Sequence, residues 1–157
     1  WEPTPPDGTI ARTPFGGYVR ALNRDARAGN IVPFALELDG QLAGQVHLFG
    51  VMRGSLLSGS AGYWLGERFA GQGVATRALA AMVDYALGPF GLHRVEVNIR
   101  PENVASLAVV AHLRFRDEGV RRSYLHIEGD WRDHRTFALT VDDLGGRPAL
   151  DRWQSRG

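Results

Sequence analysis

Two glycines, Gly71 and Gly73, stand directly before an apolar stretch with helical periodicity, and this arrangement can bind an anion. Glycine lets the chain turn sharply and lets a ligand approach the backbone closely. The amides that open a helix have no partner within it and carry about half a positive charge, so a phosphate or pyrophosphate is the natural ligand. The alternative is a glycine loop that only turns the chain, and the two glycines alone do not decide between these readings.

Several other chemistries do not fit the residues present. No Gly-Lys-Ser/Thr follows the glycines, which excludes a Walker loop, and the third glycine of a dinucleotide fingerprint is missing. The absence of cysteine excludes thiolate metal sites and a cysteine nucleophile. The five histidines show no metal-ligand spacing, so we expect no metal. Trp64 and Trp131 lack interleaved basic residues, which favours packing over nucleic-acid binding.

The elements around the glycines must position them. The apolar spacing from Val74 to Leu87 predicts a helix with one buried face that ends at Gly88-Pro89, and Asp39-Gly40 predicts a tight hairpin turn. We expect helices over 18–28, 74–87 and 104–113, and strands over 33–38, 42–51, 61–65, 94–99, 115–127 and 131–141. This order predicts one α/β (α+β) domain over 1–144, with a loop at 1–8 and a mobile or loosely packed tail at 145–157.

The composition favours one soluble domain. The 157 residues are 44% hydrophobic, which is enough for a single core. A net charge of +1 gives no overall field that would attract nucleic acid or an anionic membrane, so we expect neither as a partner. No apolar run approaches the roughly 20 residues that span a bilayer, and no signal peptide is visible. We therefore expect a cytoplasmic protein.

Six short motifs follow one another in a recognisable order and together resemble a known family. They are Gly62-Tyr63-Trp64-Leu65, Gly71-Gln72-Gly73-Val74-Ala75-Thr76, Leu92-His93-Arg94-Val95-Glu96, Pro101-Glu102-Asn103-Val104-Ala105-Ser106, Phe115-Arg116-Asp117-Glu118-Gly119 and Trp131-Arg132-Asp133-His134. In order and spacing they resemble the GNAT acetyltransferases, and within them the RimJ/RimL-type protein N-terminal acetyltransferases. The resemblance covers about residues 34–141.

The resemblance implies a GNAT fold, in which helices flank a mixed central sheet that splays between two parallel strands, here 60–65 and 94–99. It also implies acetyl-CoA as cosubstrate, with the pantetheine paired to backbone near Leu65. Its pyrophosphate would lie on the amides of Gly71, Gln72, Gly73, Val74, Ala75 and Thr76, in agreement with the anion site expected from the glycines. Asn103 would bind the pantetheine arm, and Ser106 would lie beside the thioester sulfur.

Acetyl transfer to an amine needs a neutral amine, a polarised carbonyl and a proton for the leaving thiolate. Many GNAT enzymes supply that proton from a tyrosine, but the matching position here is Val110, so the resemblance points to Ser106 as the acid or thiolate stabiliser. The alternative is that Ser106 only caps its helix. Glu96, which alternates with valines on an expected central strand, is the candidate base; alternatively it pairs structurally with Arg94 or another arginine.

The expected activity is transfer of acetyl to the N-terminal α-amine of a protein or peptide, with a ribosomal protein as one candidate and a monomer or homodimer as the assembly. Departures from the family at Ala70, Gln72 and Arg114 leave two alternatives open: a small-molecule amine acetyltransferase, and a degenerate acyl-CoA-binding module without catalysis. Relatives of this type place a strand and a helix before a stretch like Trp1-Glu2-Pro3. We therefore expect the chain to begin inside the fold, without its first strand.

Overall fold

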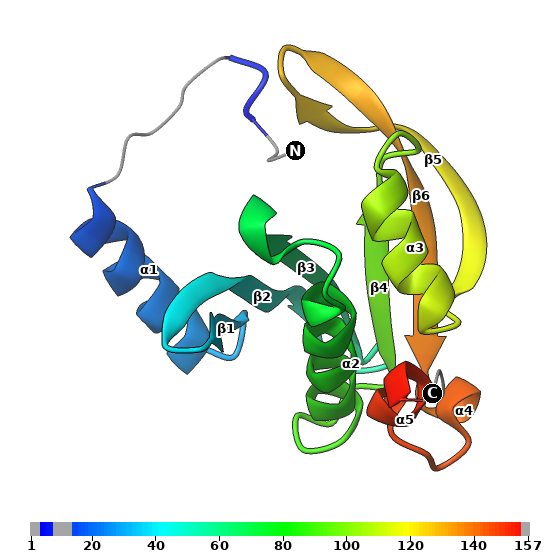
Figure 1. Cartoon of the computed structure of the whole chain (residues 1–157). Coiled ribbons are helices and arrows are strands. Elements are labelled where there is room, and N and C mark those ends of the chain that lie inside the picture. The colour runs from blue at the N-terminus through cyan, green and yellow to red at the C-terminus, as the bar shows by residue number, and fades with distance from the viewer. Residues whose placement is uncertain (1–3, 8–13, 155–157) are drawn as a thin grey trace.

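The computed structural model describes residues 4–7 and 14–154, and its centre is one six-stranded mixed sheet in the order β1-β2-β3-β4-β6-β5 (Figure 1). The strands are β1 (Val32–Leu38), β2 (Gln41–Met52), β3 (Ser58–Leu65), β4 (Arg94–Ile99), β5 (Arg116–Ile127) and β6 (Asp130–Thr140). The helices are α1 (Phe15–Arg27), the short 3-10 turn η1 (Glu67–Phe69), α2 (Val74–Leu87), α3 (Val104–His112), α4 (Val141–Leu144) and α5 (Ala149–Gln154). The predicted α/β class and its order of elements up to residue 141 are confirmed.

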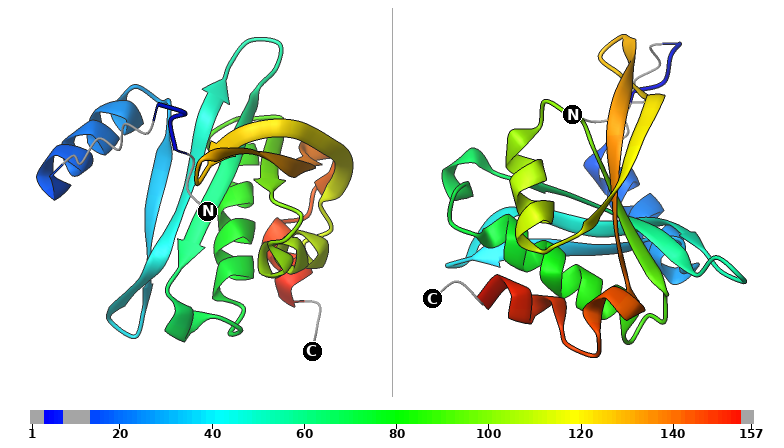
Figure 2. Two further views of the ribbon diagram at one scale, coloured as in Figure 1. Left: turned by 90° about the horizontal axis from the view of Figure 1, so that it is seen from above. Right: turned by 90° about the vertical axis from the view of Figure 1, so that its right-hand side faces the viewer.

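The predicted hairpin joins β1 to β2. Asp39 and Gly40 both have positive φ, 50° and 72°, as a turn that matches the twist of two antiparallel strands requires. β2 then pairs antiparallel with β3, and β5 and β6 form a second, longer hairpin. Figure 2 shows that this second hairpin is strongly curved and arches away from the rest of the sheet.

The parallel pair in the middle of the sheet is short. β3 and β4 pair only at Ser58↔Arg94, Gly59↔Val95 and Ser60↔Glu96. Beyond Ser60, β3 keeps its pairing with β2 as far as Leu65, whereas β4 continues beside β6 as far as Ile99. The two strands therefore separate, and the sheet splays between them as the resemblance implies.

The core lies where α2 and α3 cover one face of the sheet, which is the face toward the viewer in Figure 1. Alternate residues of β4 enter this core, and the helices supply the rest through apolar positions at helical spacing. The fully buried large side chains are Leu48, Leu79, Met82, Val83, Val95, Val110, Leu113, Ile127 and Leu139. The residues that alternate with them on β4, such as Glu96, face the other side of the sheet.

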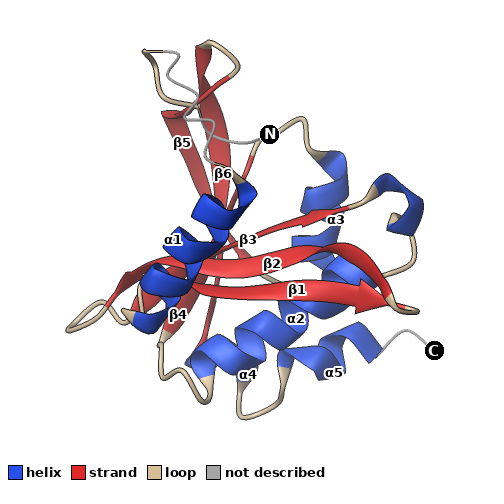
Figure 3. Cartoon of the chain, turned by 90° about the vertical axis from the view of Figure 1, so that its left-hand side faces the viewer, coloured by secondary structure: helices blue, strands red, loops and turns tan. Residues whose placement is uncertain are grey.

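The ends of the chain differ in how they pack. α1 has no buried residue and lies beside β1. The C-terminal part of the tail is ordered: residues 149–154 form α5, which runs along α2 (Figure 3) with Ala149 fully buried. The prediction of a loosely packed tail is therefore wrong for these residues. Its last three residues, and Trp1-Glu2-Pro3 with the expectation attached to them, lie outside the described residues.

Within the ranges 4–7 and 14–154, none of the helices combines the length and apolar character that crossing a membrane requires.

Candidate functional site

The glycine loop has the geometry that the sequence predicts. Gly71 and Gly73 both have φ of 75°, a left-handed conformation that residues with a Cβ adopt at a cost. Gly73 is the N-cap residue of α2, and no side chain caps that helix. Because the first amides of a helix have no acceptor within it, those of Val74, Ala75 and Thr76 are available to an anion.

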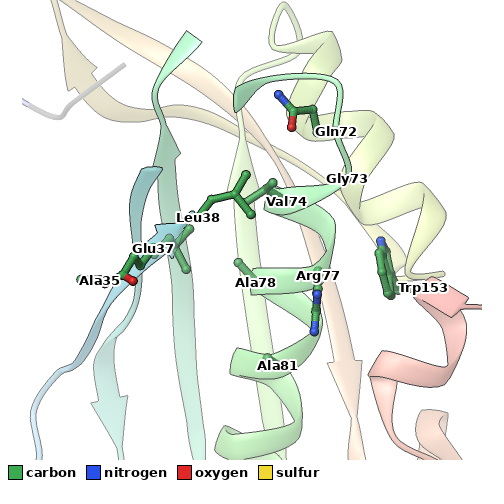
Figure 4. A pocket seen from close by; sticks show the side chains of 11 residues that line it. Ala35, Glu37, Leu38, Gln72, Gly73, Val74, Arg77, Ala78, Ala81 and Trp153 are labelled. Atoms are coloured by element: carbon green, nitrogen blue, oxygen red, sulfur yellow. The ribbon is translucent and has the colours of Figure 1, made fainter. Parts of the chain in front are cut away.

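An open pocket of about 590 Å³ borders this loop (Figure 4). Its walls are the end of β1 and the first turns of α2, with Trp153 of α5 on the far side of that helix. Trp153 packs against the loop, since a Cβ atom on Gly73 would lie 3.2 Å from its Nε1. The Arg77 guanidinium lies 5.4 Å from the centre of the Trp153 ring. Sequence reasoning missed Trp153 because it lies in the segment predicted to be a loose tail.

Arg68 and Gln72 complete the loop. The Arg68 guanidinium lies over the ring of buried Phe69 at 4.6 Å, and Nε2 of Gln72 donates to the Arg68 carbonyl at 3.1 Å. Gln72 therefore stabilises the turn through its own side chain. A ligand at this loop would meet backbone amides first.

Leu65 lies at the end of β3, on the part of the strand that has left the parallel pair. On one side it is paired with Gly44 of β2. On the other side no strand of the described chain lies against it, because the β3–β4 ladder ends at Ser60. An extended ligand arm could pair with this backbone as a strand would.

The first turn of α3 faces the same opening. Oδ1 of Asn103 accepts the Ser106 amide at 3.1 Å, so Asn103 is the cap of α3 and Ser106 lies one turn inside it. The alternative in which Ser106 caps the helix is therefore wrong. This cap occupies only the oxygen of the Asn103 amide. Val110, where the resemblance would place a tyrosine, is fully buried.

The other wall of the opening carries a tyrosine whose hydroxyl is buried. Tyr63 lies on β3 and packs against the core, and its hydroxyl is buried. Burial raises the pKa of Tyr63, and its interaction with the Ser106 hydroxyl opposes that rise. By ordinary geometric limits, Oη of Tyr63 has no hydrogen-bond partner among the described residues. Sequence reasoning found no signal for Tyr63 beyond its place in the Gly-Tyr-Trp-Leu motif.

Glu96 lies on the opposite face of the sheet and is held by two arginines. One carboxylate oxygen accepts from Nε of Arg94 at 3.0 Å, and the other accepts from the Arg121 guanidinium, also at 3.0 Å. Both oxygens are thus engaged in ion pairs, and the side chain is only 18% exposed. This arrangement favours the structural pairing that the sequence left open, and a role for Glu96 as base stays a prediction.

Arg94 links Glu96 to a second carboxylate, Glu118 on β5. The Arg94 guanidinium binds both Glu118 oxygens, one at 3.0 Å, and Arg116 binds Glu118 as well. These charges, with Arg94 as the largest cause, lower the pKa of Glu118 to about 2. The network ties β4 to the strongly curved β5.

His134 on β6 shares this polar face. Its Nδ1 lies 3.0 Å from the Arg132 carbonyl, which can only accept, so Nδ1 carries the proton. Burial lowers the pKa of His134, which keeps the imidazole neutral with Nε2 as an acceptor at neutral pH. The Tyr124 ring packs edge-on against it at 5.6 Å. Sequence reasoning named His134 only as part of the Trp131-Arg132-Asp133-His134 motif. Among the described residues, no three His, Cys, Asp or Glu side chains lie together as a metal site requires.

The structure therefore brings most of the predicted site together. The loop at 71–76 opens α2, Asn103 and Ser106 open α3, and Leu65 ends β3 beside the gap between the parallel strands. Glu96 stands on the other face of the sheet.

Comparison with known proteins places this arrangement in a family. The acetyltransferase (GNAT) domain matches residues 2–116. The chain is 37% identical over 105 residues to "Probable N-acetyltransferase YjcK" of Bacillus subtilis, covering 67% of this chain and 58% of that protein. It is 30% identical over 145 residues to the [ribosomal protein uS5]-alanine N-acetyltransferase of Escherichia coli, covering 91% of this chain and 75% of that protein.

Among solved structures, RimJ of Mycobacterium smegmatis in complex with CoA-disulfide superposes with a TM-score of 0.89 at 36% identity. That match covers 99% of this chain and 75% of the RimJ chain. These relatives are longer than the sequence described, but the matched region contains the loop, the open strand pair and the start of α3. The chain belongs to the GNAT acetyltransferase family, and its relatives include ribosomal-protein alanine N-acetyltransferases.

Proposed function

We propose that this protein is an acetyl-CoA-dependent N-acetyltransferase that acts on the N-terminal α-amine of a protein or peptide, with a ribosomal protein as the first candidate. The observation that carries the proposal is the 30% identity with the uS5-alanine N-acetyltransferase over 91% of the chain. The first turn of α2, which no side chain caps, fits the pyrophosphate of CoA. The unpaired side of β3 fits the pantetheine arm.

The chain's own residues have distinct tasks in this proposal. The amides of residues 71–76 hold the pyrophosphate, and the backbone near Leu65 holds the pantetheine arm. Asn103 binds that arm through the amide nitrogen that its cap leaves unused. Ser106, at the start of α3, places a hydroxyl beside the sulfur.

The reaction itself needs no covalent enzyme intermediate. The amine nitrogen bonds to the thioester carbonyl carbon, the bond from that carbon to sulfur breaks, and the products are the amide and CoA thiol. The protons balance within the site, since the amine loses one proton and the thiolate gains one. Because an α-amine has a pKa of roughly 8, a useful fraction is neutral at pH 7 and a base acting through water suffices.

Two groups on the polar face can be tested as that base. Glu96 has a carboxylate but both its oxygens are ion-paired, whereas His134 offers an unprotonated Nε2 at neutral pH. Replacing each by glutamine and comparing the pH dependence of kcat/KM separates them. The variant that loses the acidic limb of the profile carries the base.

The decisive experiment mixes the purified chain with acetyl-CoA and peptides that begin with Ala or Ser, and follows thiol release and the mass of the peptide. Ser106→Ala is the matched variant, and we expect it to lower turnover while CoA still binds. Polyamines, amino acids and aminoglycosides form a second panel, and turnover there alone would favour the small-molecule alternative. Tight CoA binding with no turnover on any amine would favour the non-catalytic module.

A further inference from the structure

Trp153 of α5 presents the polar end of its side chain to the glycine loop. Figure 4 shows the indole nitrogen at the end of the ring that is nearer the loop. A Cβ atom on Gly73 would lie 3.2 Å from Nε1 of Trp153, so this nitrogen lies close to the loop backbone. An indole N–H can only donate, and no group within residues 4–7 and 14–154 accepts a hydrogen bond from it. The indole therefore adds a side-chain donor to the amides of the loop.

Arg77 adds a positive charge on the same side of α2. Its guanidinium lies 5.4 Å from the centre of the Trp153 ring, and the side chain is exposed. Within the part of the chain that the structure describes, Arg77 forms no ion pair. Glu37, the one carboxylate among the described residues that line the pocket, belongs to β1 on the opposite wall (Figure 4). The charge of Arg77 is therefore available to an anionic ligand.

α5 is anchored in a way that holds Trp153 beside the loop. The two carboxylate oxygens of Asp84 accept the first amides of α5, that of Ala149 at 2.5 Å. Near the other end of α5, Nη1 of Arg152 donates to the Leu113 carbonyl at 2.9 Å, which ties the helix to the end of α3. Trp153 is itself partly buried and packs against the core. The indole is thus ordered in the free protein, and a ligand does not have to order it.

The nucleotide end of CoA has the groups that these donors bind. In the proposed function the pyrophosphate lies on the amides of residues 71–76, and the ribose with its 3′-phosphate continues from there. Arg77 follows Gly73 by about one helical turn, so its long side chain can reach a second phosphate that one ribose separates from the first. Guanidinium groups and N–H donors bind phosphate oxygens through charge-assisted hydrogen bonds. The pantetheine arm carries no charge and does not need them.

We propose that Trp153 and Arg77 bind the nucleotide end of CoA, with the indole N–H donating to the pyrophosphate and the guanidinium to the 3′-phosphate. The inference rests on the proposed function and extends its cofactor site from the glycine loop to α5. The C-terminal helix then helps the protein to select CoA over pantetheine thioesters that lack the nucleotide.

Calorimetric titration with three probes tests this assignment: CoA, dephospho-CoA, which lacks the 3′-phosphate, and pantetheine, which lacks every phosphate. Arg77→Gln should raise the Kd for CoA roughly tenfold and leave that for dephospho-CoA within about twofold. Trp153→Phe keeps an aromatic ring but removes the N–H, and should raise the Kd for CoA and for dephospho-CoA alike by about 3–10-fold. Neither substitution should change the Kd for pantetheine.

Three results would overturn the inference. The first is an unchanged Kd for CoA in either variant. The second is a loss that is equal for CoA and pantetheine, because the substitution would then disturb the whole opening. The third is an equal loss for CoA and dephospho-CoA in Arg77→Gln, which would remove the 3′-phosphate as the partner of the guanidinium.

Arg53→Gln is the matched control. Arg53 also lies over an aromatic ring, that of Phe90 at 4.5 Å, but at the other end of α2. We expect it to leave the Kd unchanged for all three probes. Because salt screens exposed charges, the loss in Arg77→Gln should shrink as the salt concentration rises from about 0.05 to about 0.5 M. A loss that did not depend on salt would contradict a contact between the guanidinium and a phosphate.

Melting temperatures of the variants separate binding from folding. If Trp153→Phe loosened α5 and lowered the melting temperature, Arg77→Gln would still decide the inference, because it replaces an exposed side chain. The titrations need no turnover. If the parent protein transfers no acetyl group to any amine, the proposed function fails, and the three Kd values still decide which residues bind the nucleotide end.

Discussion

Gly44 of β2 provides the sharpest test of how the opening is held. It pairs with Leu65 at the end of β3, and its backbone lies unusually close to that strand. A Cβ atom at position 44 would lie 2.2 Å from the Trp64 carbonyl oxygen and 3.0 Å from Cα of Leu65. Both neighbours are backbone, so Gly44→Ala must move β3 away from β2 by about 1 Å to restore ordinary contact distances.

The size of the effect follows from that displacement. Overpacking of this kind costs roughly 1–3 kcal/mol, which lowers the melting temperature of a domain of this size by roughly 2–12 °C. The displaced residues are those proposed to pair with the pantetheine arm. A shift of about 1 Å in a binding group weakens function by up to about 100-fold. We expect calorimetric titration with CoA to show a loss of at least about tenfold.

Gly16→Ala is the control for Gly44→Ala. Gly16 lies in α1, and an added Cβ there would meet only the end of Arg20, at 3.6 Å. We expect it to leave CoA binding unchanged and stability unchanged or slightly raised, because alanine is the better helix former. If Gly44→Ala matched Gly16→Ala in both melting temperature and CoA affinity, the close approach of β2 and β3 would not hold the opening in place.

Three further predictions concern the frame around the site. Glu118→Gln should lower the melting temperature above pH 4.5 but not near pH 2. The depressed pKa of the Glu118 carboxyl adds stability that is lost as pH falls from 4.5, the ordinary pKa of glutamate, toward about 2. A melting-temperature difference that stayed constant across a pH series would contradict this. Asp84→Ala removes the carboxylate that accepts the amides of Ala149 and Leu150, and should cost about 0.5–2 kcal/mol and speed hydrogen exchange in α5; unchanged exchange there would refute it. Arg114→Gly should raise the melting temperature by roughly 2–4 °C, because Arg114 has φ of 58°; a lower value would mean that its side chain stabilises more than its backbone costs.

The elements and the anion loop could be predicted because their causes are local. The apolar spacing of 74–87 indicates a helix wherever it lies, and Asp39-Gly40 turns the chain by its own backbone preferences. The left-handed conformations of Gly71 and Gly73 follow from glycine itself. Arg114, one of the departures from the family, has a positive φ, which is costly for a residue with a Cβ.

The rest depends on contacts between distant segments. The tail becomes a helix because Asp84, some 65 positions earlier, accepts its first amides. The sequence suggests Arg94 or another arginine as a partner of Glu96, but only the fold of β5 brings Arg121 to it. Tyr63 is one aromatic residue among several in the sequence, and only its packing against the core buries its hydroxyl. Residue spacing along the sequence does not indicate such long-range contacts.

The three residue pairs between β3 and β4 join two half-sheets, β1–β3 and β4–β6, that are otherwise held together by the helices lying across them. Mechanically this is a narrow hinge in the centre of the molecule. A ligand arm bound along the free side of β3 and against α3 would fix the angle between the two half-sheets. Occupancy should therefore stiffen the whole sheet and raise its melting temperature in proportion to the logarithm of ligand concentration, far beyond the few residues that touch the ligand.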